Sequence, residues 1–556
     1  MKKGDIIQIE IIDMTEEGKG IGRFDSLVIF IPGVVPGDII EAQIIKLKKR
    51  YGIAKLHKIL KHSDSRVNPK CKYFGNCGGC SLLNLNYERQ LELKRNAVID
   101  KLTRIGKIPN PTVRDIVPSE LIKGYRNKAR YAVGRDGSVG FYIRGTNRVI
   151  DCKTCSLQND AAVKIAESIR QLIKDGLIPF EIDKNGSLRA FTVKACEGSG
   201  EVMVVMEIFG KELLNAEEIV YAIEDSLENI KGYFLKSVVI ATLKDKGIHS
   251  EIDKYKVIAG TETITDFVKF TDGKTLKFEI SAASFYQINT MQMVNLYEKA
   301  VEYANLTGEE LLLDLYCGIG TIGLSMADEA KYVMGIESVK EAILNANRNA
   351  SINGIVNAVY YQGKVEEIFE SSLDDLENRI NKGIKSAKKV AIVDPPRAGC
   401  DENLLKTLTE VEPERIVYIS CDAGTLARDI KYLEMNGYKF VEATPIDMFP
   451  NTMAIETVAL LSKLDVEKHI SVEIELDEMD LTSAESKATY KQIQNYVLEK
   501  FRFKVSTRYI AQVKKKHGLE VREHYNIPKN EKQKVPQCPI QKEEAILDAL
   551  KHFKML

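Results

Sequence analysis

The sequence has neither a net charge nor a long apolar run. Its 79 lysine and arginine residues equal its 79 acidic residues over 556 positions, so the whole chain gives no electrostatic sign of nucleic-acid binding. No segment approaches the roughly 18 apolar residues of a membrane-spanning helix, and the N-terminus has no apolar stretch long enough for a signal peptide. We therefore expect a cytoplasmic protein with no membrane partner, and the sequence gives no sign of an obligate protein partner.

Disulfide bonds are not expected either. Thiols stay reduced in the cytoplasm, so the ten cysteines are candidates for metal binding and catalysis rather than for cross-links. A hydrophobic content of 44% is sufficient for buried cores. The length predicts about three or four domains.

Charge is nevertheless segregated along the chain. Residues 41–70 hold nine basic residues against two acidic ones, and residues 500–534 hold eleven against three. Residues 123–135 hold five basic residues and no acidic residue, interleaved with Tyr125 and Tyr131. Solvated surface is one interpretation of these runs. Phosphate contact, with the two tyrosines as stacking faces for bases, is the other.

Hydrophobic periodicity divides the chain into four parts. Short alternating runs with glycine and proline turns predict a small β-barrel over residues 1–60. Residues 61–270 predict a helix at 84–105 followed by strands. Strands alternate with helices over 271–463, which indicates a doubly wound, Rossmann-like α/β sheet. Residues 464–556 predict a small appended α/β module, with an alternating run from Ile470 and these candidate core residues: Tyr496, Leu498, Phe501, Val505, Tyr509, Ile510 and Val513.

Four cysteines have the spacing of metal ligands. Cys71, Cys77 and Cys80 lie within ten residues, with glycines that let the backbone wrap closely, and Cys155 follows as a distant fourth. Zinc and a [4Fe–4S] cluster both accept four thiolates, so the spacing leaves both open. Cys152, three residues before Cys155, is an alternative ligand. The spacing differs from the Cys-x3-Cys-x2-Cys of radical enzymes, so we expect a structural site.

A glycine-rich turn follows a predicted strand at Leu311–Tyr316. The turn begins at Gly318 and formally fits the G-x-G-x-x-G fingerprint of NAD binding. Asp314, at the end of the strand, suits the ammonium group of S-adenosylmethionine (SAM) better than a pyrophosphate. Glu337 ends the next strand and would bind a ribose diol of either cofactor. The Pro-Pro-Arg that follows Asp394 has no place in a dehydrogenase, so we favour SAM.

Cys421, at the end of a predicted buried strand, has the position of a nucleophile. Addition of a thiolate to carbon 6 of uracil makes carbon 5 nucleophilic enough to accept a methyl group from a sulfonium. Release then requires a base that removes the carbon 5 proton, and Glu456 is the candidate. Asp394, at the mouth of another strand, would face substrate and cofactor. The remaining cysteines are interpreted as inert: Cys196, Cys317, Cys400 and Cys538.

Three motifs occur in the order and combination of a known family: Asp394-Pro-Pro-Arg397, Ser420-Cys-Asp422 and Ile455-Glu-Thr-Val458. On them the chain resembles the RNA uracil-C5 methyltransferases over residues 1–463, specifically the iron–sulfur 23S ribosomal RNA branch with an N-terminal TRAM domain. TRAM is an OB-like barrel that binds RNA, and the glycine-rich run from Gly18 to Arg23 resembles part of it. The family commonly has a histidine where this chain has Ala454, which puts any role of that histidine in question.

The resemblance implies SAM-dependent methylation of carbon 5 of uridine in RNA, with 23S ribosomal RNA as the expected target. Transfer RNA is the alternative target, and a non-catalytic iron–sulfur RNA-binding protein is the alternative class. The resemblance also implies packing of helix 84–105 on the catalytic domain and a [4Fe–4S] cluster in the 61–270 domain, held by Cys71, Cys77, Cys80 and Cys155.

Further residues acquire roles from the resemblance alone. Gln287, in Phe285-Tyr-Gln-Ile-Asn289, is implied to touch SAM and the target base, although capping of a helix by this polar pair is the alternative. Tyr316 is implied to lie beside the adenosine end of the SAM pocket. Arg126 and Lys128 are implied to contact RNA.

Overall fold

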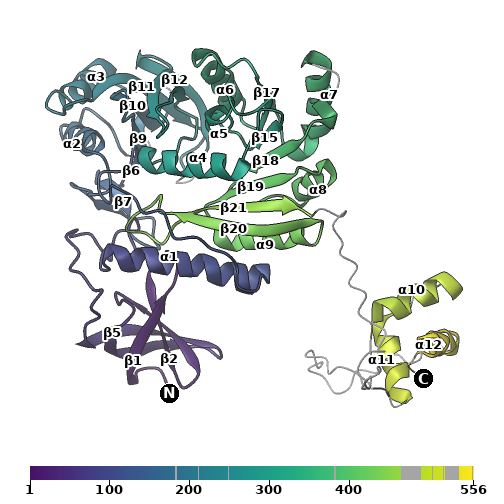
Figure 1. Cartoon of the computed structure of the whole chain (residues 1–556). Coiled ribbons are helices and arrows are strands. Elements are labelled where there is room, and N and C mark those ends of the chain that lie inside the picture. Colours follow the sequence, from purple (N-terminus) through teal and green to yellow (C-terminus); the bar gives the residue numbers. More distant parts are fainter. Residues whose placement is uncertain are drawn as a thin grey trace. The chain divides into compact units, whose positions relative to one another are not determined.

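The computed structural model describes residues 1–181, 184–210, 212–247, 250–380, 384–464, 490–501, 503, 505–517, 519, 538–553 and 555. The chain divides into two compact units, Met1–Asp465 and Val466–Leu556 (Figure 1). No helix in these described ranges is long and apolar enough to cross a membrane. The division follows directly after the last strand of the first unit.

The N-terminal strands close into a barrel, as their alternating pattern predicted. Burial alternates along the first strand as far as Ile11: Ile7, Ile9 and Ile11 are buried, whereas Ile6 and Gln8 are exposed. The barrel closes in the order β1-β2-β3-β5-β4, with β1 paired to β4. Its strands are β1 Ile6–Met14, β2 Lys19–Phe24, β3 Leu27–Pro32, β4 Ile39–Leu47 and β5 Tyr51–Lys61.

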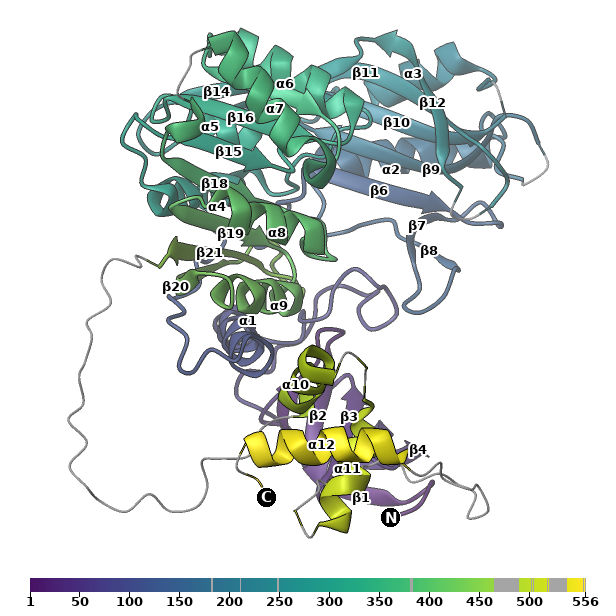
Figure 2. The ribbon, with the colours of Figure 1, turned by 90° about the vertical axis from the view of Figure 1, so that its right-hand side faces the viewer.

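A long helix, α1 (Tyr87–Lys101), follows the barrel and lies between it and the catalytic sheet (Figures 1 and 2). The Asn86 side chain caps it by accepting a hydrogen bond from the Arg89 amide. A π-helical turn, η1 (Leu102–Gly106), extends it. Val98 and Leu102 are buried in the same apolar core as the residues of the catalytic sheet. The expected packing of helix 84–105 on the catalytic domain is therefore observed.

The central part is a seven-stranded sheet with the order β12-β11-β10-β9-β6-β7-β8. Helices α2 (Asp160–Lys174) and α3 (Ala216–Asp225) share an apolar core with it. A separate hairpin, β13 (Thr263–Lys269) with β14 (Thr275–Ser281), follows the sheet. The sheet strands are β6 Lys128–Val133, β7 Val139–Tyr142, β8 Val149–Asp151, β9 Ser187–Ala195, β10 Glu201–Phe209, β11 Phe234–Leu243 and β12 Ile252–Gly260.

The expected stacking of bases on Tyr125 and Tyr131 is wrong. Both side chains are among the fully buried ones of the chain. Tyr131 stacks on Phe191, with ring centroids 5.2 Å apart, and the Tyr125 hydroxyl donates to the Pro450 carbonyl at 3.1 Å. Their apolar faces therefore serve the protein core, and no ring face is left for RNA.

The catalytic part is a second seven-stranded sheet with the order β17-β16-β15-β18-β19-β21-β20. The first five strands are parallel, and β21 runs antiparallel between β19 and β20. Its strands are β15 Leu311–Leu315, β16 Tyr332–Glu337, β17 Ala358–Gln362, β18 Lys389–Val393, β19 Arg415–Ser420, β20 Tyr438–Ile446 and β21 Glu456–Lys463. Its helices are α4 Thr290–Ala304, α5 Thr321–Ser325, α6 Lys340–Ile352, α7 Val365–Ile380, η2 Ile384–Ser386, α8 Glu402–Val411 and α9 Ala423–Glu434.

A buried ion pair joins α1 to the segment that follows β20. Lys94 Nζ lies 2.5 Å from Asp447 Oδ1, and neither side chain has exposed surface. Tyr87 donates its hydroxyl to the other Asp447 oxygen at 2.7 Å. Burial lowers the pKa of Lys94, whereas the neighbouring Asp447 opposes that shift. Loss of one partner from such a pair typically costs about 3–5 kcal/mol, because the other charge stays buried.

The described part of the second unit consists of helices α10 (Tyr490–Phe501), α11 (Thr507–Lys516) and α12 (Ile540–His552). Three of its predicted core residues, Val505, Ile510 and Val513, are buried, and Tyr496 and Tyr509 are partly buried against the same cluster. Leu498 and Phe501 are exposed, which contradicts their assignment to the core. The alternating run from Ile470 lies outside the described residues.

Candidate active site and cysteine pocket

The carboxyl ends of the parallel strands gather the predicted catalytic and cofactor residues at one edge of the sheet. Glu337 ends β16, Asp394 follows β18, and Cys421 follows β19. Ser420 pairs with Thr457 across the antiparallel β19–β21 ladder. Because β21 runs in the opposite direction, its first residue, Glu456, starts at the edge where β19 ends.

Cys421 lies in a mixed electrostatic environment. Burial raises the pKa of its thiol to about 11, and the nearby Glu456 carboxylate adds to the shift. Arg397 opposes both effects, through its charge and through a hydrogen bond to the thiol. Arg397 is part of a motif in the sequence, but the sequence alone predicted no role for it. Its guanidinium is the group that favours the thiolate here.

Three buried carboxyl groups form a chain of electrostatic neighbours behind Cys421. Burial raises the pKa of Glu456 well above its usual range, and the charge of Asp394 adds to this. Burial also raises the pKa of Asp394 and of Asp314 to about 7 each, and Asp314 contributes to the shift at Asp394. The raised pKa values make these groups stronger bases than exposed carboxylates.

Tyr297 on α4 is a second site residue that sequence reasoning missed. It is buried, and its hydroxyl lies 2.8 Å from Thr321 Oγ1 at the start of α5. Asp394, Asp314 and Glu456 all raise the pKa of its phenol after the larger effect of burial. Tyr297 continues the apolar face of an amphipathic helix, so no sequence signal separated it from ordinary core residues.

The residues of the glycine-rich turn fit an amino-acid ammonium and a ribose. Asp314 accepts the Gly323 amide with Oδ2 at 2.9 Å, while its buried Oδ1 has no partner in the protein. Glu337 accepts the Gly318 amide at 3.3 Å. Gly318 and the half-buried Tyr316 both have left-handed backbone conformations, with φ of 54° and 64°. An unsatisfied buried carboxylate oxygen is the acceptor that the ammonium group of SAM requires.

Gln287 and Asn289 lie just before α4, and both are buried. The Asn289 side chain caps α4 by accepting the Gln292 amide, so the capping alternative applies to Asn289. The backbone carbonyl of Gln287 accepts a hydrogen bond from Asn127 at 2.8 Å. The cap of α4 is formed by the Asn289 side chain, and the contact of Gln287 with SAM and the base stays a prediction.

The four cysteines predicted to bind a metal line one cavity of about 50 Å³, together with Cys152. The Cys155 sulfur accepts hydrogen bonds from the backbone amides of Leu157 and Gln158, and the Cys77 sulfur accepts the Gly79 amide at 3.4 Å. The Cys152 thiol instead donates to the Thr154 carbonyl at 3.2 Å. Amides directed at sulfur favour the thiolate form, which a metal ligand must adopt.

The cavity does not identify its occupant. Among the described residues, no group of three or more His, Cys, Asp or Glu side chains has the arrangement that holds one metal ion. The sulfur atoms of the four cysteines are donors that both zinc and an iron–sulfur cluster accept.

Arg126 and Lys128 do not lie on an exposed strand edge. Arg126 lines the cysteine cavity, and its Nε is buried without a hydrogen-bond partner. Lys128 is partly buried, and burial lowers its pKa. This placement puts a cation beside the thiols. Burial lowers the pKa of Arg126, but Tyr125 and then Cys80 and Cys155 raise it, and the net shift is upward.

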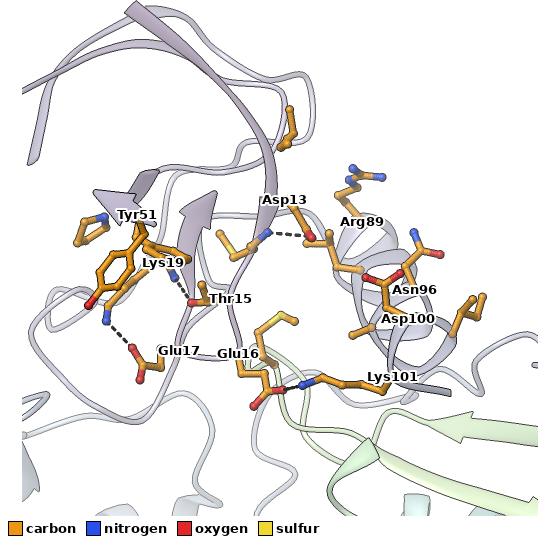
Figure 3. A pocket seen from close by; sticks show the side chains of 18 of the residues that line it. Asp13, Thr15, Glu16, Glu17, Lys19, Tyr51, Arg89, Asn96, Asp100 and Lys101 are labelled. Carbon is orange, nitrogen blue, oxygen red and sulfur yellow. Dashed lines mark hydrogen bonds and ion pairs between the residues drawn. The ribbon is translucent and has the colours of Figure 1, made fainter. Parts of the chain in front are cut away.

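A cavity of about 1030 Å³ lies between the barrel and α1 (Figure 3). It contains neither Cys421 nor Glu456. Four acidic side chains line it, and both lysines in its lining are paired, Lys101 with Glu16 and Lys19 with Glu17. Such a balance of charges does not favour a phosphate site.

Comparison with known proteins gives a consistent result. Residues 86–464 match the family model described as tRNA (Uracil-5-)-methyltransferase, and residues 1–57 match the TRAM domain. Uncharacterized RNA methyltransferases of Halalkalibacterium halodurans and Caldanaerobacter subterraneus are each 38% identical, over 83% and 84% of this chain and 98% and 99% of theirs. The solved Pyrococcus abyssi tRNA (uracil-54, C5)-methyltransferase in complex with S-adenosyl-L-homocysteine is 29% identical. It has a TM-score of 0.62 and covers 82% of this chain and 99% of that chain.

The raised pKa of Cys421 has a measurable consequence. A thiol with a pKa of about 11 ionises more as the pH rises, so its alkylation by iodoacetamide should accelerate about tenfold per pH unit between about pH 7 and 9. Arg397→Met should slow alkylation at every pH in this range, because Arg397 lowers that pKa. Mass spectrometry of the Cys421 peptide gives the rate.

Lys431→Met, on the exposed side of α9, is the control and should leave the alkylation rate unchanged. A rate that is already independent of pH at pH 7 would mean that the thiol is ionised there, which contradicts the environment described.

Proposed function

Because the chain belongs to the tRNA (uracil-5-)-methyltransferase family and is a SAM-dependent RNA (uracil-C5)-methyltransferase, we propose that Cys421 is its nucleophile and Glu456 its base. The observation that carries this assignment is the β19–β21 pairing, which brings the two side chains to one sheet edge within electrostatic reach. Arg397 influences the pKa of both.

The reaction assigns each residue one task. The Cys421 thiolate, favoured by Arg397, adds to carbon 6, and the electron pair of the carbon 5–carbon 6 double bond moves into an enolate. SAM, when bound, supplies an electrophilic methyl group on a sulfonium. Glu456 then takes the carbon 5 proton, and the pair left behind restores the double bond and expels the Cys421 thiolate. Ala454 carries no titratable side chain, so we assign the base role to Glu456 alone.

The residues that we assign to the cofactor lie at the same edge of the sheet. We assign to Asp314 the binding of the SAM ammonium group and to Glu337 the binding of the ribose diol. At Gly318 we assign a close approach of the backbone to the cofactor. The unsatisfied Asp314 oxygen supports the first assignment. The further residues that we assign to the walls of the SAM and base pocket are Gln287, Tyr316 and Asp394.

Variants of the two catalytic residues should separate the steps. Cys421→Ala should bind RNA and SAM yet form no covalent adduct, because it lacks the thiol that adds to carbon 6. Glu456→Gln should accumulate protein covalently joined to methylated RNA, because addition and methylation precede proton removal. A shifted band that resists denaturant reports the adduct in gels.

Wild-type protein given RNA that contains 5-fluorouridine is the positive control, because fluorine cannot leave as a proton. Normal turnover by Glu456→Gln, or an adduct in Cys421→Ala, would show that the roles are assigned to the wrong residues.

We also propose that Cys71, Cys77, Cys80 and Cys155 hold a [4Fe–4S] cluster. Support comes from the single cavity that the four cysteines line and from the amides directed at the Cys77 and Cys155 sulfurs. The cluster would supply a fixed cross-link between residues 71–80 and residue 155. Arg126 would offset part of the negative charge of the thiolates.

Protein purified without oxygen should contain about four iron and four sulfide per chain, as a four-cysteine cluster requires. Cys155→Ser should lose the iron, whereas Cys152→Ser should retain it, because only Cys155 receives backbone amides at its sulfur. Iron and sulfide analysis with the visible absorption spectrum reports both. Stoichiometric zinc without iron would contradict the cluster, and the reverse result for the two variants would reassign the ligand.

For the RNA target we propose 23S ribosomal RNA, supported by the resemblance of the cysteine motif and the TRAM barrel to that branch. Transfer RNA is the second candidate, favoured by the similarity to the tRNA (uracil-54, C5)-methyltransferase of Pyrococcus abyssi. The non-catalytic alternative is wrong, since the comparisons show a methyltransferase.

Deletion of the gene should remove 5-methyluridine from ribosomal RNA and leave transfer RNA unchanged. Mass spectrometry of both RNA classes from the deletion strain, compared with its complemented parent, measures this. Loss confined to transfer RNA would assign the enzyme to the second target.

A further inference from the structure

Nine residues, Asp447–Ile455, connect β20 to β21 and lead directly into Glu456. We call this segment the strap. Its first part is fixed from two helices. On the α1 side, Lys94 pairs with Asp447 and donates to the Phe449 carbonyl at 3.0 Å. On the α4 side, Gln292 donates to the Asp447 carbonyl at 3.1 Å. The start of the strap therefore has contacts that do not involve the cysteine pocket.

The middle of the strap contacts both α1 and the segment that follows Cys80. On the α1 side, the Asn451 amide donates to the Gln90 side chain at 3.0 Å. Asn451 has a left-handed backbone conformation, with φ of 68°, which an L residue adopts only at some cost. Its carbonyl accepts two backbone hydrogen bonds, from Ser81 and from Leu82, each 3.1 Å long. Its side chain donates to the Ile122 carbonyl at 2.8 Å. These contacts hold the strained residue in place.

Ser81 makes a further contact closer to Glu456. Its hydroxyl accepts the Met453 amide at 3.0 Å, three residues before Glu456. The Met453 side chain is buried in a small apolar cluster with these residues of the barrel, the cysteine loop and α1: Met14, Val35, Leu82, Leu85 and Leu93. Ser81 directly follows Cys80, so a displacement of Cys80 is transmitted to Met453 through one peptide unit.

Residues 71–80 form turns without a helix or an extended strand, and they contact the β7–β8 hairpin. The Gly78 amide donates to the Tyr142 carbonyl at 3.2 Å, and the Arg144 amide donates to the Asn76 carbonyl at 2.9 Å. The Arg144 side chain donates to the Cys80 carbonyl at 2.6 Å. A metal group bound by the Cys80 thiol would add a further link to these contacts.

We propose that Ser81 is a positioning residue for Glu456, through which a metal group bound by Cys80 fixes the strap and thereby the base. The inference rests on the proposed role of Glu456. It adds a task for the cysteine pocket. Its occupant acts on proton removal and not on SAM binding, because the residues assigned to the ammonium and the ribose of SAM, Asp314 and Glu337, lie on β15 and β16.

Ser81→Ala tests this inference against a matched control. Ser156 also directly follows a predicted cysteine ligand and lines the same cavity, but its exposed side chain has no hydrogen bond to the strap among the described residues. Both variants are compared with wild type for iron content, SAM affinity, turnover, adduct accumulation and deuterium exchange of the Met453 amide. Iron-free wild type, prepared with a chelator, is measured alongside them.

Ser81→Ala should keep its iron and its SAM affinity, while turnover falls about tenfold, as expected for loss of one positioning hydrogen bond. It should accumulate the methylated RNA adduct, because only proton removal is impaired, and its Met453 amide should exchange faster. Iron-free wild type should show the same faster exchange, and Ser156→Ala should match wild type throughout.

Normal turnover by Ser81→Ala overturns the proposal. So does a Ser81→Ala variant that loses adduct formation and adduct release equally, or one that loses its iron. Unchanged Met453 exchange in iron-free protein overturns the link to the pocket. If Glu456→Gln traps no adduct, the base assignment fails instead, and the Met453 exchange rate still decides whether Ser81 holds the strap.

Discussion

The ion pair between Lys94 and Asp447 is the contact on which the arrangement of the first unit depends. A lysine without exposed surface needs a fully compensating partner, and Asp447 provides it together with Tyr87. The pair joins α1, which follows the barrel, to the strap, which leads into Glu456. The Gln292 side chain, at the start of α4, donates a hydrogen bond to the backbone carbonyl of Asp447. Three parts of the chain that are distant in sequence, α1, α4 and the strap, thus meet at Asp447.

The parts of the fold that local pattern decides were predictable. The barrel, the strand that ends in Glu337 and the turn at Gly318 follow from alternation and glycine placement. Local pattern was not sufficient to predict the site, because only the antiparallel pairing of β21 explains how Glu456 reaches Cys421. Tyr125 and Tyr131 were misassigned since burial depends on tertiary packing, which a run of basic and aromatic residues does not reveal.

The site also shows how a neutral chain can contain a strongly acidic pocket. Asp314, Asp394 and Glu456 lie behind a single flanking cation, Arg397, and burial raises the pKa of each carboxyl group. Each carboxyl group therefore keeps its proton to a higher pH than an exposed one, so the pocket carries less negative charge near neutral pH than three exposed carboxylates would.

The position of β21 has a consequence for biosynthesis. Although it is the last strand of the sheet in the sequence, it lies inside the sheet, paired on one side to β19 and on the other to β20. During translation β19 and β20 therefore remain without their shared neighbour until residues 456–463 have left the ribosome. Because the same strand begins with Glu456, the sheet and the pocket are completed in one event, and a partly synthesised chain has neither.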